Sequence, residues 1–533
     1  MKLPGITLRE FLADEEKRGN VMVIDDELST DLEISAMASL MERSGKILGF
    51  NRIMNAPGYS LVTGLFSTEE RMTRILGSEN EDEFYRRWTA ITGDGSSNEL
   101  PVEKAVPNDM SIVDHPDLLS LPVLRHYRND GKRTGNGRYI TGGIVAARDP
   151  SDPERMNLSF TRIQVMAKGR YAFDAGSHGH LWSYLQQCRK TGTPLEMSVI
   201  IGAPPVHYLT AAAFMDDEYR RIGRLFNFSY YGGYRNDVPV PAESEIVIEA
   251  RYLPGEEYDE GPFAEYTGYM GYDSTRSVAE VRSIIARKKP IYVDIMPSNS
   301  REHINLFSFT RSIRVNSVIR ETSPKGHDIR IIWPNFGSRF LAIGYIDPPF
   351  PGLAKNVAIS AMANDPLWNK VVIVNEGKTD LSIERMLLSL AETRNFSSTL
   401  TILRDLYVIS SDPTAKADGT DSKLLAVTKG SNGPFRIEKH PESVAIYSAR
   451  GKVLISHGES DADVNILIPE AIEASDMEKV GWTLALNMDC DRDLRMDDEH
   501  LIIDLRKDLH EIPEEDRDAT SKASEVAMKY RVS

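Results

Sequence analysis

The chain has 533 residues, of which 41% are hydrophobic and 27% charged, which is the composition of a folded globular protein and not of a disordered or fibrous one. Its 63 Lys and Arg against 79 Asp and Glu give a formal net charge of −16, which argues against nucleic-acid binding because such proteins need a basic stripe. No apolar stretch approaches the roughly 20 residues that cross a bilayer, and two cysteines are too few for a disulfide framework. We therefore expect a soluble, cytoplasmic protein without a membrane partner.

The first part of the chain, residues 1–110, mixes helical and strand signals. Its patterns predict an amphipathic helix at residues 8–16, a buried strand at residues 21–25 and a helix start at Ser67 or Thr68. The stretch 92–110 is rich in Gly, Ser, Asn and Pro, which predicts an exposed connection. We therefore expect an N-terminal α/β region that ends near residue 110.

The second part, residues 111–315, holds β-branched, partly alternating runs punctuated by Gly and Pro, which is typical of a sheet or barrel domain. These runs predict strands at residues 138–147, 158–169, 194–203 and 244–253. Helices are predicted at residues 178–190, 208–226 and 278–289.

The third part, residues 316–490, alternates strand-like and helical segments, with helices predicted at residues 353–365 and 381–394. Such alternation favours a layered α/β domain. The last part, residues 491–533, is highly charged and is predicted to be an exposed terminal helix or arm.

The segment EGPFAEYTGY, residues 260–269, is the richest in candidate chemistry. Glu260 and Glu265 bracket a Gly-Pro-Phe turn, so the chain can bring both carboxylates towards one cavity. Two neighbouring carboxylates cannot both ionise cheaply, so one would be held protonated as a general acid. The alternative is a surface turn between two exposed acids.

The segment that starts at Asn157 reads NLSFTR. By the two-residue period of a strand, Asn157, Ser159 and Thr161 share one face, and Phe160 and Arg162 share the other. If Arg162 faces inward, it is a buried cation that needs a carboxylate or an anionic ligand. The alternative is an exposed arginine on a strand.

Two further segments carry possible metal or phosphate ligands. His178 and His180 lie just before a predicted helix, whose first amides could hold a phosphate, although a loop histidine is more often structural. Three acids at another helix start complement the helix dipole or bind a metal ion: Asp216, Asp217 and Glu218.

In chain order, these segments resemble the UbiD family of reversible, non-oxidative decarboxylases, which use prenylated flavin mononucleotide. The resemblance rests on RYITGGIV, NLSFTR, the Ser-His pair at 177–178, VIIGAPP, DEY, VPAESEIVIEA, EGPFAEYTGY and KKPIYVDIMPSNSREH. It covers residues 5 to 430. It implies an α/β fold with an N-terminal α/β region, a flavin-binding split β-barrel (α+β) and a C-terminal α/β domain.

The resemblance assigns a catalytic triad to Arg162, Glu260 and Glu265. Arg162 would hold the substrate carboxylate, Glu260 would pair with that arginine, and Glu265 would donate the proton that replaces CO₂. Asn157, His178 and Glu218 would bind Mn²⁺ or Mg²⁺, with K⁺ close by, and so tie the cofactor phosphate to the protein.

The resemblance also implies cofactor contacts and partners. The remaining cofactor contacts would come from Ser159, Phe160, Thr161, Ser177 and, as a further candidate, Lys370. The substrate would be a conjugated carboxylic acid, with an aromatic or heteroaromatic acid favoured by Phe160, Phe263, Tyr266 and residues 406–409. A homodimer or higher homo-oligomer is expected, with a UbiX-type flavin prenyltransferase as the supplier of the cofactor.

The chain departs from the family pattern at four places. Ala264 stands where the family often has Gly, His180 follows the Ser-His pair, and residues 374–377 and 422–428 differ from the usual C-terminal motifs. Two alternatives stay open. A metal-dependent hydrolase could use His178, His180 and Glu218, but it would leave Arg162 without a role. A cofactor-binding homologue without activity is disfavoured because the triad is complete.

Overall fold

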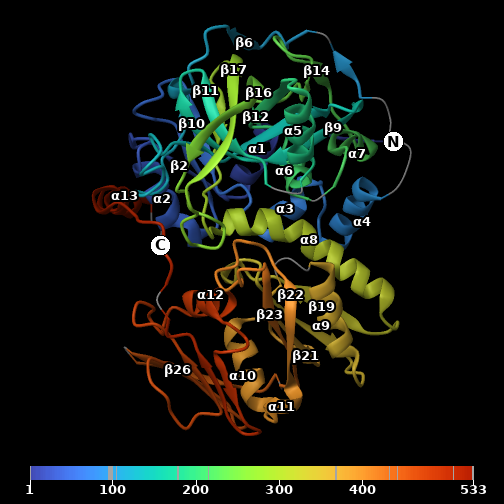
Figure 1. The fold of residues 1–533 in the computed structure, drawn as a ribbon, viewed down its shortest axis with the longest axis vertical. Helices are drawn as coiled ribbons and strands as arrows, with labels where there is room; N and C mark the ends of the chain where they lie inside the picture. The colour runs from blue at the N-terminus through green and yellow to red at the C-terminus, as the bar shows by residue number, and fades with distance from the viewer. Residues whose placement is uncertain are drawn as a thin grey trace. The chain divides into compact units, whose positions relative to one another are not determined.

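The computed structural model describes residues 2–93, 100–103, 105–176, 179–213, 215–365, 369–430, 432–440, 442–507 and 509–530 (Figure 1). The chain divides into two compact units. Unit 1 consists of Met1–Glu265, Tyr269–Phe307 and Pro513–Ser533, and unit 2 consists of Tyr266–Gly268 and Ser308–Ile512. The mixed α/β class is confirmed. In the part of the chain that the structure describes, no helix combines the length and apolar character needed to span a membrane.

The N-terminal part of unit 1 follows its sequence signals closely. Thr7 and Glu10 form a capping box at the start of α1 (Leu8–Lys17), and Thr68 caps α3 (Glu69–Ile75) as predicted. A four-stranded sheet has the order β18-β4-β3-β2. Its strands are β2 (Val21–Ile24), β3 (Ile47–Phe50), β4 (Ser60–Thr63) and β18 (Ile291–Val293). The other helices of this part are α2 (Glu33–Met41) and α4 (Glu81–Thr92).

A larger sheet occupies the region that was predicted to form a barrel. Its order is β7-β10-β11-β17-β16-β12-β8-β9, and β6 pairs with β17 off this path. The strands are β6 (Met110–Val113), β7 (Tyr139–Ile140), β8 (Gly143–Asp149), β9 (Asp152–Phe160), β10 (Arg162–Ala167), β11 (Arg170–Asp174), β12 (Leu195–Ile201), β16 (Ile246–Glu260) and β17 (Ser274–Arg287). A two-stranded sheet pairs β1 (Leu3–Pro4) with β13 (Phe226–Asn227). A three-stranded sheet has the order β15-β14-β5, with β5 at Val102–Glu103, β14 at Tyr230–Gly232 and β15 at Pro239–Pro241.

The predicted helix at residues 278–289 is wrong, because this segment belongs to β17, which pairs with β11 and β16. The register against β16 shifts between Glu249 and Ala250, which leaves Arg282 as an extra residue in β17. Such a bulge interrupts the two-residue alternation, so the apolar spacing looks helical. The helix predicted at residues 208–226 is two helices, α6 (Pro205–Ala212) and α7 (Glu218–Leu225), whereas α5 (His180–Thr191) lies as predicted.

Unit 2 contains the layered α/β arrangement that was predicted. A five-stranded sheet has the order β19-β20-β21-β23-β22, in which β20, β21 and β23 are parallel. Its strands are β19 (Asp328–Ile332), β20 (Leu341–Asp347), β21 (Val371–Glu376), β22 (Leu400–Tyr407) and β23 (Thr420–Thr428). The helices are α8 (Arg301–Thr322), which begins in unit 1, α9 (Leu353–Asn364), α10 (Ile383–Thr393) and α11 (Phe396–Thr399). α9 packs on β21 and β23 around a buried aliphatic core.

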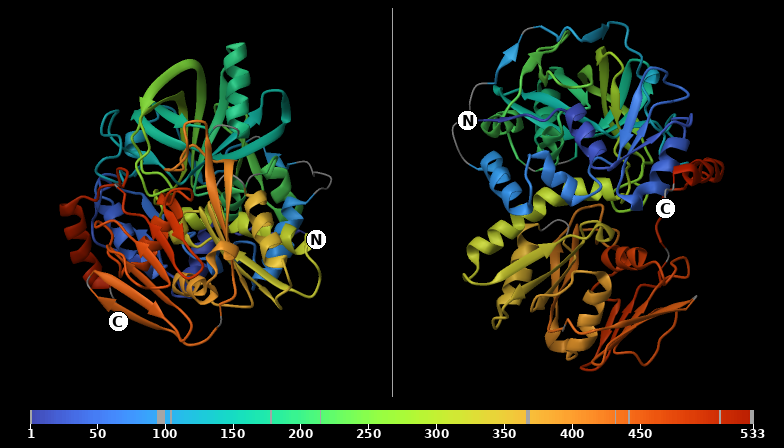
Figure 2. Two further views of the ribbon diagram at one scale, coloured as in Figure 1. Left: turned by 60° about the horizontal axis from the view of Figure 1, so that its bottom comes forward. Right: turned by 180° about the vertical axis from the view of Figure 1, so that it is seen from behind.

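A second sheet of unit 2 follows in the sequence and is drawn in orange to red in Figure 2. Its strand order is β24-β25-β26-β27-β29-β28. Its strands are β24 (Arg436–His440), β25 (Ser443–Tyr447), β26 (Lys452–Ser456), β27 (Val464–Leu467), β28 (Leu494–Met496) and β29 (Leu501–Asp504), with α12 (Met477–Asn487) between β27 and β28. The boundary predicted at residue 490 falls inside this sheet. The chain ends with α13 (Arg517–Tyr530), which packs on α2 in unit 1 (Figure 1).

Candidate active site

Arg162, Glu260 and Glu265 meet in unit 1. The Arg162 Nη2 donates to Glu260 Oε2 at 2.5 Å, and its Nη1 donates to Glu265 Oε1. The side chains of Arg162 and Glu260 are 10% and 0% exposed, and that of Glu265 is 31% exposed. The arginine is therefore a buried cation between two carboxylates, and the alternative of a surface turn fails for Glu260.

Sheet order and register bring these residues together. Arg162 begins β10 and Glu260 ends β16, and β11 and β17 lie between these two strands (Figure 1). On a flat sheet, three steps of about 4.8 Å would separate the two backbones by about 14 Å. The direct ion pair therefore needs two long side chains and a sheet that curls towards the space that they share.

Burial and charge compete within this cluster. Burial raises the pKa of Glu260, and the charge and hydrogen bond of Arg162 oppose that rise. Burial alone would lower the pKa of Arg162, but Glu265 and Glu260 together hold it above its usual value. The arginine therefore keeps its charge despite burial.

Two neighbours of Glu260 were missed by the sequence analysis. The Nε of Arg276 lies 3.9 Å from Glu260 Oε2, and its Nη2 is 3.0 Å from Asp174 Oδ2. Tyr139 is fully buried, lies beside Glu260 and packs on Phe263 with ring centroids 4.3 Å apart. Arg276 lies in β17, two residues before the segment that was predicted as a helix, and the register of β11 and β17 brings it close to Asp174.

A second group of predicted residues lies at β9 and at the start of α7. Glu218 is buried, and its Oε2 accepts a hydrogen bond from Leu158 N at 3.0 Å. Asn157 precedes Leu158 in β9 and is also buried. Its Nδ2 donates to Ser159 Oγ at 3.2 Å, which fits the predicted shared face. Asp216 instead pairs with Arg221, as expected for an acid at a helix start.

The Glu218 carboxylate has the environment of a cation ligand. Burial raises its pKa well above the usual value, and Asp217 and Asp216 add to this rise. Among the described residues, no Lys or Arg forms an ion pair with it, although a buried carboxylate needs a counter-charge. Carboxylate and amide oxygens suit a hard divalent ion, so Glu218 and Asn157 fit a metal site.

The remaining predicted residues differ in how they are placed. The Thr161 Oγ1 is buried without a hydrogen-bond partner among the described residues, as expected of a group that faces a ligand. Phe160 packs near Phe307 with ring centroids 5.3 Å apart. His180 begins α5. The predicted ligands at residues 177–178 lie outside the described residues. Over the rest of the chain, no group of three or more His, Cys, Asp or Glu side chains could hold a metal ion.

Lys370, the further candidate for a cofactor contact, lies among buried acidic side chains. It lies in unit 2, is fully buried, and its Nζ is 3.1 Å from Asp412 and 3.2 Å from Asp421. Its charge is thus already compensated. This geometry favours a structural role over contact with phosphate or flavin.

Comparison with known proteins gives matches over most of the chain. Three family models of 3-octaprenyl-4-hydroxybenzoate carboxy-lyase match: the N-terminal domain at residues 12–91, the Rift-related domain at residues 99–300 and the C-terminal domain at residues 304–427. The anhydromevalonate phosphate decarboxylase of Methanothermobacter thermautotrophicus is 28% identical over 78% of this chain and 95% of its own. The phenolic acid decarboxylase of Bacillus subtilis is 22% identical over 78% of this chain and 91% of its own.

Comparison with solved structures also finds a UbiD-class enzyme and a decarboxylase. The UbiD-class enzyme HmfF from Pelotomaculum thermopropionicum, in complex with FMN, is 28% identical with a TM-score of 0.71, over 80% of this chain and 95% of its own. The vanillic acid decarboxylase of Sedimentibacter hydroxybenzoicus, in its open form, shares the fold at 22% identity and a TM-score of 0.69, over 82% of this chain and 95% of its own. The family models, the decarboxylase relatives and the shared fold together place the chain in the UbiD family of carboxy-lyases.

Proposed function

We propose that this protein is a reversible, non-oxidative decarboxylase of a conjugated carboxylic acid that uses prenylated FMN. The observation that carries the proposal is the buried Arg162, which bridges Glu260 and Glu265. The cofactor is supported by two structures of HmfF, one in complex with FMN and one with prFMN, at 28% and 26% identity. When bound, the modified flavin supplies the electron sink for the carbon that loses CO₂.

The difference in exposure between the two glutamates divides their roles. Glu260 is fully buried and approached by two arginines, so it stays in place and orients Arg162. Glu265 is partly exposed and is held through Arg162 Nη1 and its own backbone N, so its side chain can give way to a substrate carboxylate. Arg162 then holds that carboxylate by charge-assisted hydrogen bonds, and Glu265 delivers the proton to the carbon that CO₂ leaves.

The metal and phosphate roles rest on the cluster at β9. Glu218 and Asn157, with His178, would hold Mn²⁺ or Mg²⁺, which ties the cofactor phosphate to the protein with K⁺ close by. The uncompensated burial of Glu218 supports this assignment. Ser159, Phe160, Thr161 and Ser177 would line the cofactor, and the Thr161 hydroxyl, unpaired among the described residues, supports that placement.

The substrate class is proposed more narrowly from the aromatic side chains at the triad. Phe263 packs on Tyr139, and the Arg162 guanidinium lies 5.6 Å from the centroid of the Phe263 ring. A flat aromatic or heteroaromatic acid fits such a surface better than a short alkenoic acid. A homo-oligomer is supported by an evolved dimeric form of HmfF, and the cofactor requires a UbiX-type flavin prenyltransferase in the same cell.

The test is purification after co-expression with a flavin prenyltransferase, followed by an absorbance spectrum and the mass of the released ligand. The loaded protein is then incubated with aromatic and acrylic acids in deuterated water. We expect prenylated FMN together with CO₂ release or deuterium exchange on one acid. Absence of flavin after supply of Mn²⁺ and K⁺ would refute the proposal and favour the hydrolase alternative.

A further inference from the structure

The loop that carries Glu265 is fixed by its backbone. Thr134 Oγ1 donates to Gly261 O, Gly131 N donates to Pro262 O at 2.8 Å, and Ala264 N donates to Asp130 Oδ1 at 3.3 Å. These three attachments all come from one segment, residues 127–134, which we call the cradle. Buried backbone groups in an irregular loop need such partners, so the cradle specifies the path of the chain up to Glu265.

Asp130 is the centre of this cradle. Its side chain is 1% exposed, its Oδ2 accepts from Tyr127 N at 3.0 Å, and its Oδ1 accepts from Ala264 N, one residue before Glu265. One carboxylate thus joins the backbone of the cradle to the backbone of the catalytic loop. Because each of its oxygens accepts from a different segment, the carboxylate is a direct link between the two.

Packing reinforces the same link. The ring of Tyr127 forms a small buried cluster with Ala264 and Met270. Ala264 is the position where the chain carries a methyl group in place of the glycine that the family often has, and it is fully buried. The methyl group of Ala264 packs against Tyr127, so the packing of the cradle explains why alanine stands here in place of glycine.

The far side of the cradle is held by the C-terminal arm, residues 513–530. Arg128 N donates to Glu514 O at 2.7 Å, and Glu514 N donates to Asn129 Oδ1 at 3.0 Å. The arm itself is anchored through α13, where Lys522 pairs with Glu33 at 2.6 Å. It lies beyond residue 427, where the matched family models end.

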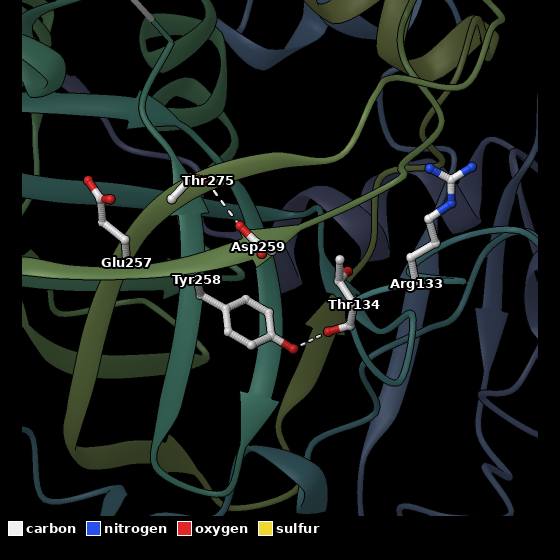
Figure 3. Close-up of a pocket in the computed structure, with 6 residues that line it drawn as sticks. All are labelled: Arg133, Thr134, Glu257, Tyr258, Asp259 and Thr275. Carbon is white, nitrogen blue, oxygen red and sulfur yellow. Dashed lines mark hydrogen bonds between the residues drawn. The ribbon is translucent and has the colours of Figure 1, made fainter.

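The outer face of the cradle borders an open hollow of about 460 Å³, which none of the three triad residues lines (Figure 3). There the Tyr258 hydroxyl donates to Thr134 O, which ties the cradle to β16 just before Glu260 (Figure 3). The cradle thus contacts both the strand that ends at Glu260 and the loop that ends at Glu265.

We propose that the cradle is a positioning element for Glu265, with Asp130 and Thr134 as positioning residues and the C-terminal arm as its brace. The inference rests on the proposed role of Glu265 as proton donor. It adds residues that touch neither substrate nor cofactor but set the place from which the proton is delivered. Displacement of a catalytic group by about 1 Å can slow a reaction by about 100-fold.

The test compares Asp130→Asn and Thr134→Val in the full-length, flavin-loaded protein. The Asp130→Asn change would place a side-chain donor against one of the two backbone amides, and Thr134→Val removes the donor to Gly261 O at constant shape. Two controls make the same chemical changes elsewhere in unit 1. Asp149→Asn alters a buried carboxylate that accepts from Ser151 N, and Thr73→Val removes a hydroxyl that donates to Glu69 O.

We expect kcat to fall between about 10- and 100-fold in both cradle variants, with KM and flavin content within about twofold of the unchanged protein. Hydrogen exchange of the peptide that contains Ala264 should become faster in both variants and stay unchanged in both controls. Unchanged exchange and unchanged kcat in Thr134→Val, the milder variant, would overturn the inference even if Asp130→Asn fails to fold. Inactivity of the unchanged protein would instead contradict the proposed function, while the exchange measurement would still decide whether the cradle holds the loop.

Discussion

Replacement of Glu265 by Gln separates the proposed proton donor from its neighbours. Glutamine keeps the shape and an oxygen that can accept from Arg162 Nη1, but it has no acidic proton. The side chain is 31% exposed, so loss of this ion pair should change the free energy of unfolding by no more than about 1 kcal/mol. Turnover should fall at least about 100-fold, which corresponds to about 2.7 kcal/mol of activation free energy. A loss of turnover of this size can therefore be distinguished from the small loss of stability.

The assay measures CO₂ release, flavin content and melting temperature on the same preparation. Glu196→Gln is the matched control, because Glu196 is 29% exposed and accepts from Arg251 Nε at 2.6 Å on a different pair of strands. We expect the control to keep full turnover and Glu265→Gln to keep its flavin. Turnover of Glu265→Gln within about threefold of the unchanged protein would refute the assignment of Glu265 as proton donor.

Three further predictions concern buried charges. Lys370→Met should lower the free energy of unfolding by about 3–5 kcal/mol, because Asp412 and Asp421 lose their buried counter-charge. If the melting temperature of this variant is unchanged and it loses flavin instead, Lys370 is a cofactor ligand. Mn²⁺ should raise the melting temperature of the unchanged protein and not of Glu218→Gln, and an equal rise in both would remove Glu218 from the metal site. Burial raises the pKa of Glu302 to about 7, so its stabilising contribution is complete below pH 4.5 and is lost as the pH rises through 7. The melting temperature of the unchanged protein should therefore fall, relative to that of Glu302→Gln, between about pH 5 and 8; a constant difference would contradict this pKa.

The sequence predicted well those features that repeat along the chain. The helix at residues 8–17, the cap at Thr68 and the alternation of strands and helices in unit 2 follow from caps and apolar periodicity, and they agree with the prediction. β17 was misread because one bulged residue breaks its alternation, and β24 gave no signal because all five of its residues are exposed. Local periodicity therefore fails where the sheet itself is irregular or faces water.

The residues of the candidate site also divide into those that the sequence could predict and those that it could not. Arg162 and the two glutamates could be picked out because they stand in a recognisable order of charged residues and glycines. Asp130 could not, because it lies in a polar loop whose partner, Ala264, is 134 residues away in the chain. Arg276 could not either, because its partners are chosen by the register of β11 and β17 and not by neighbours in sequence. What was missed is the set of contacts that only the tertiary fold creates.

The charges around the triad link substrate binding to proton delivery. Three carboxylates share two guanidinium groups. Arg162 pairs with Glu260 and Glu265. Arg276 pairs with Asp174 and also lies within 3.9 Å of Glu260. A substrate carboxylate would add a fourth negative charge to a largely buried cluster, where uncompensated charge is costly, so its arrival favours the uptake of a proton. Glu260 is shielded from water, whereas Glu265 is partly exposed and shares Arg162 with the incoming acid. Under the proposed function, the incoming acid therefore displaces Glu265 and not Glu260 from Arg162, which leaves Glu265 next to the carbon that receives the proton.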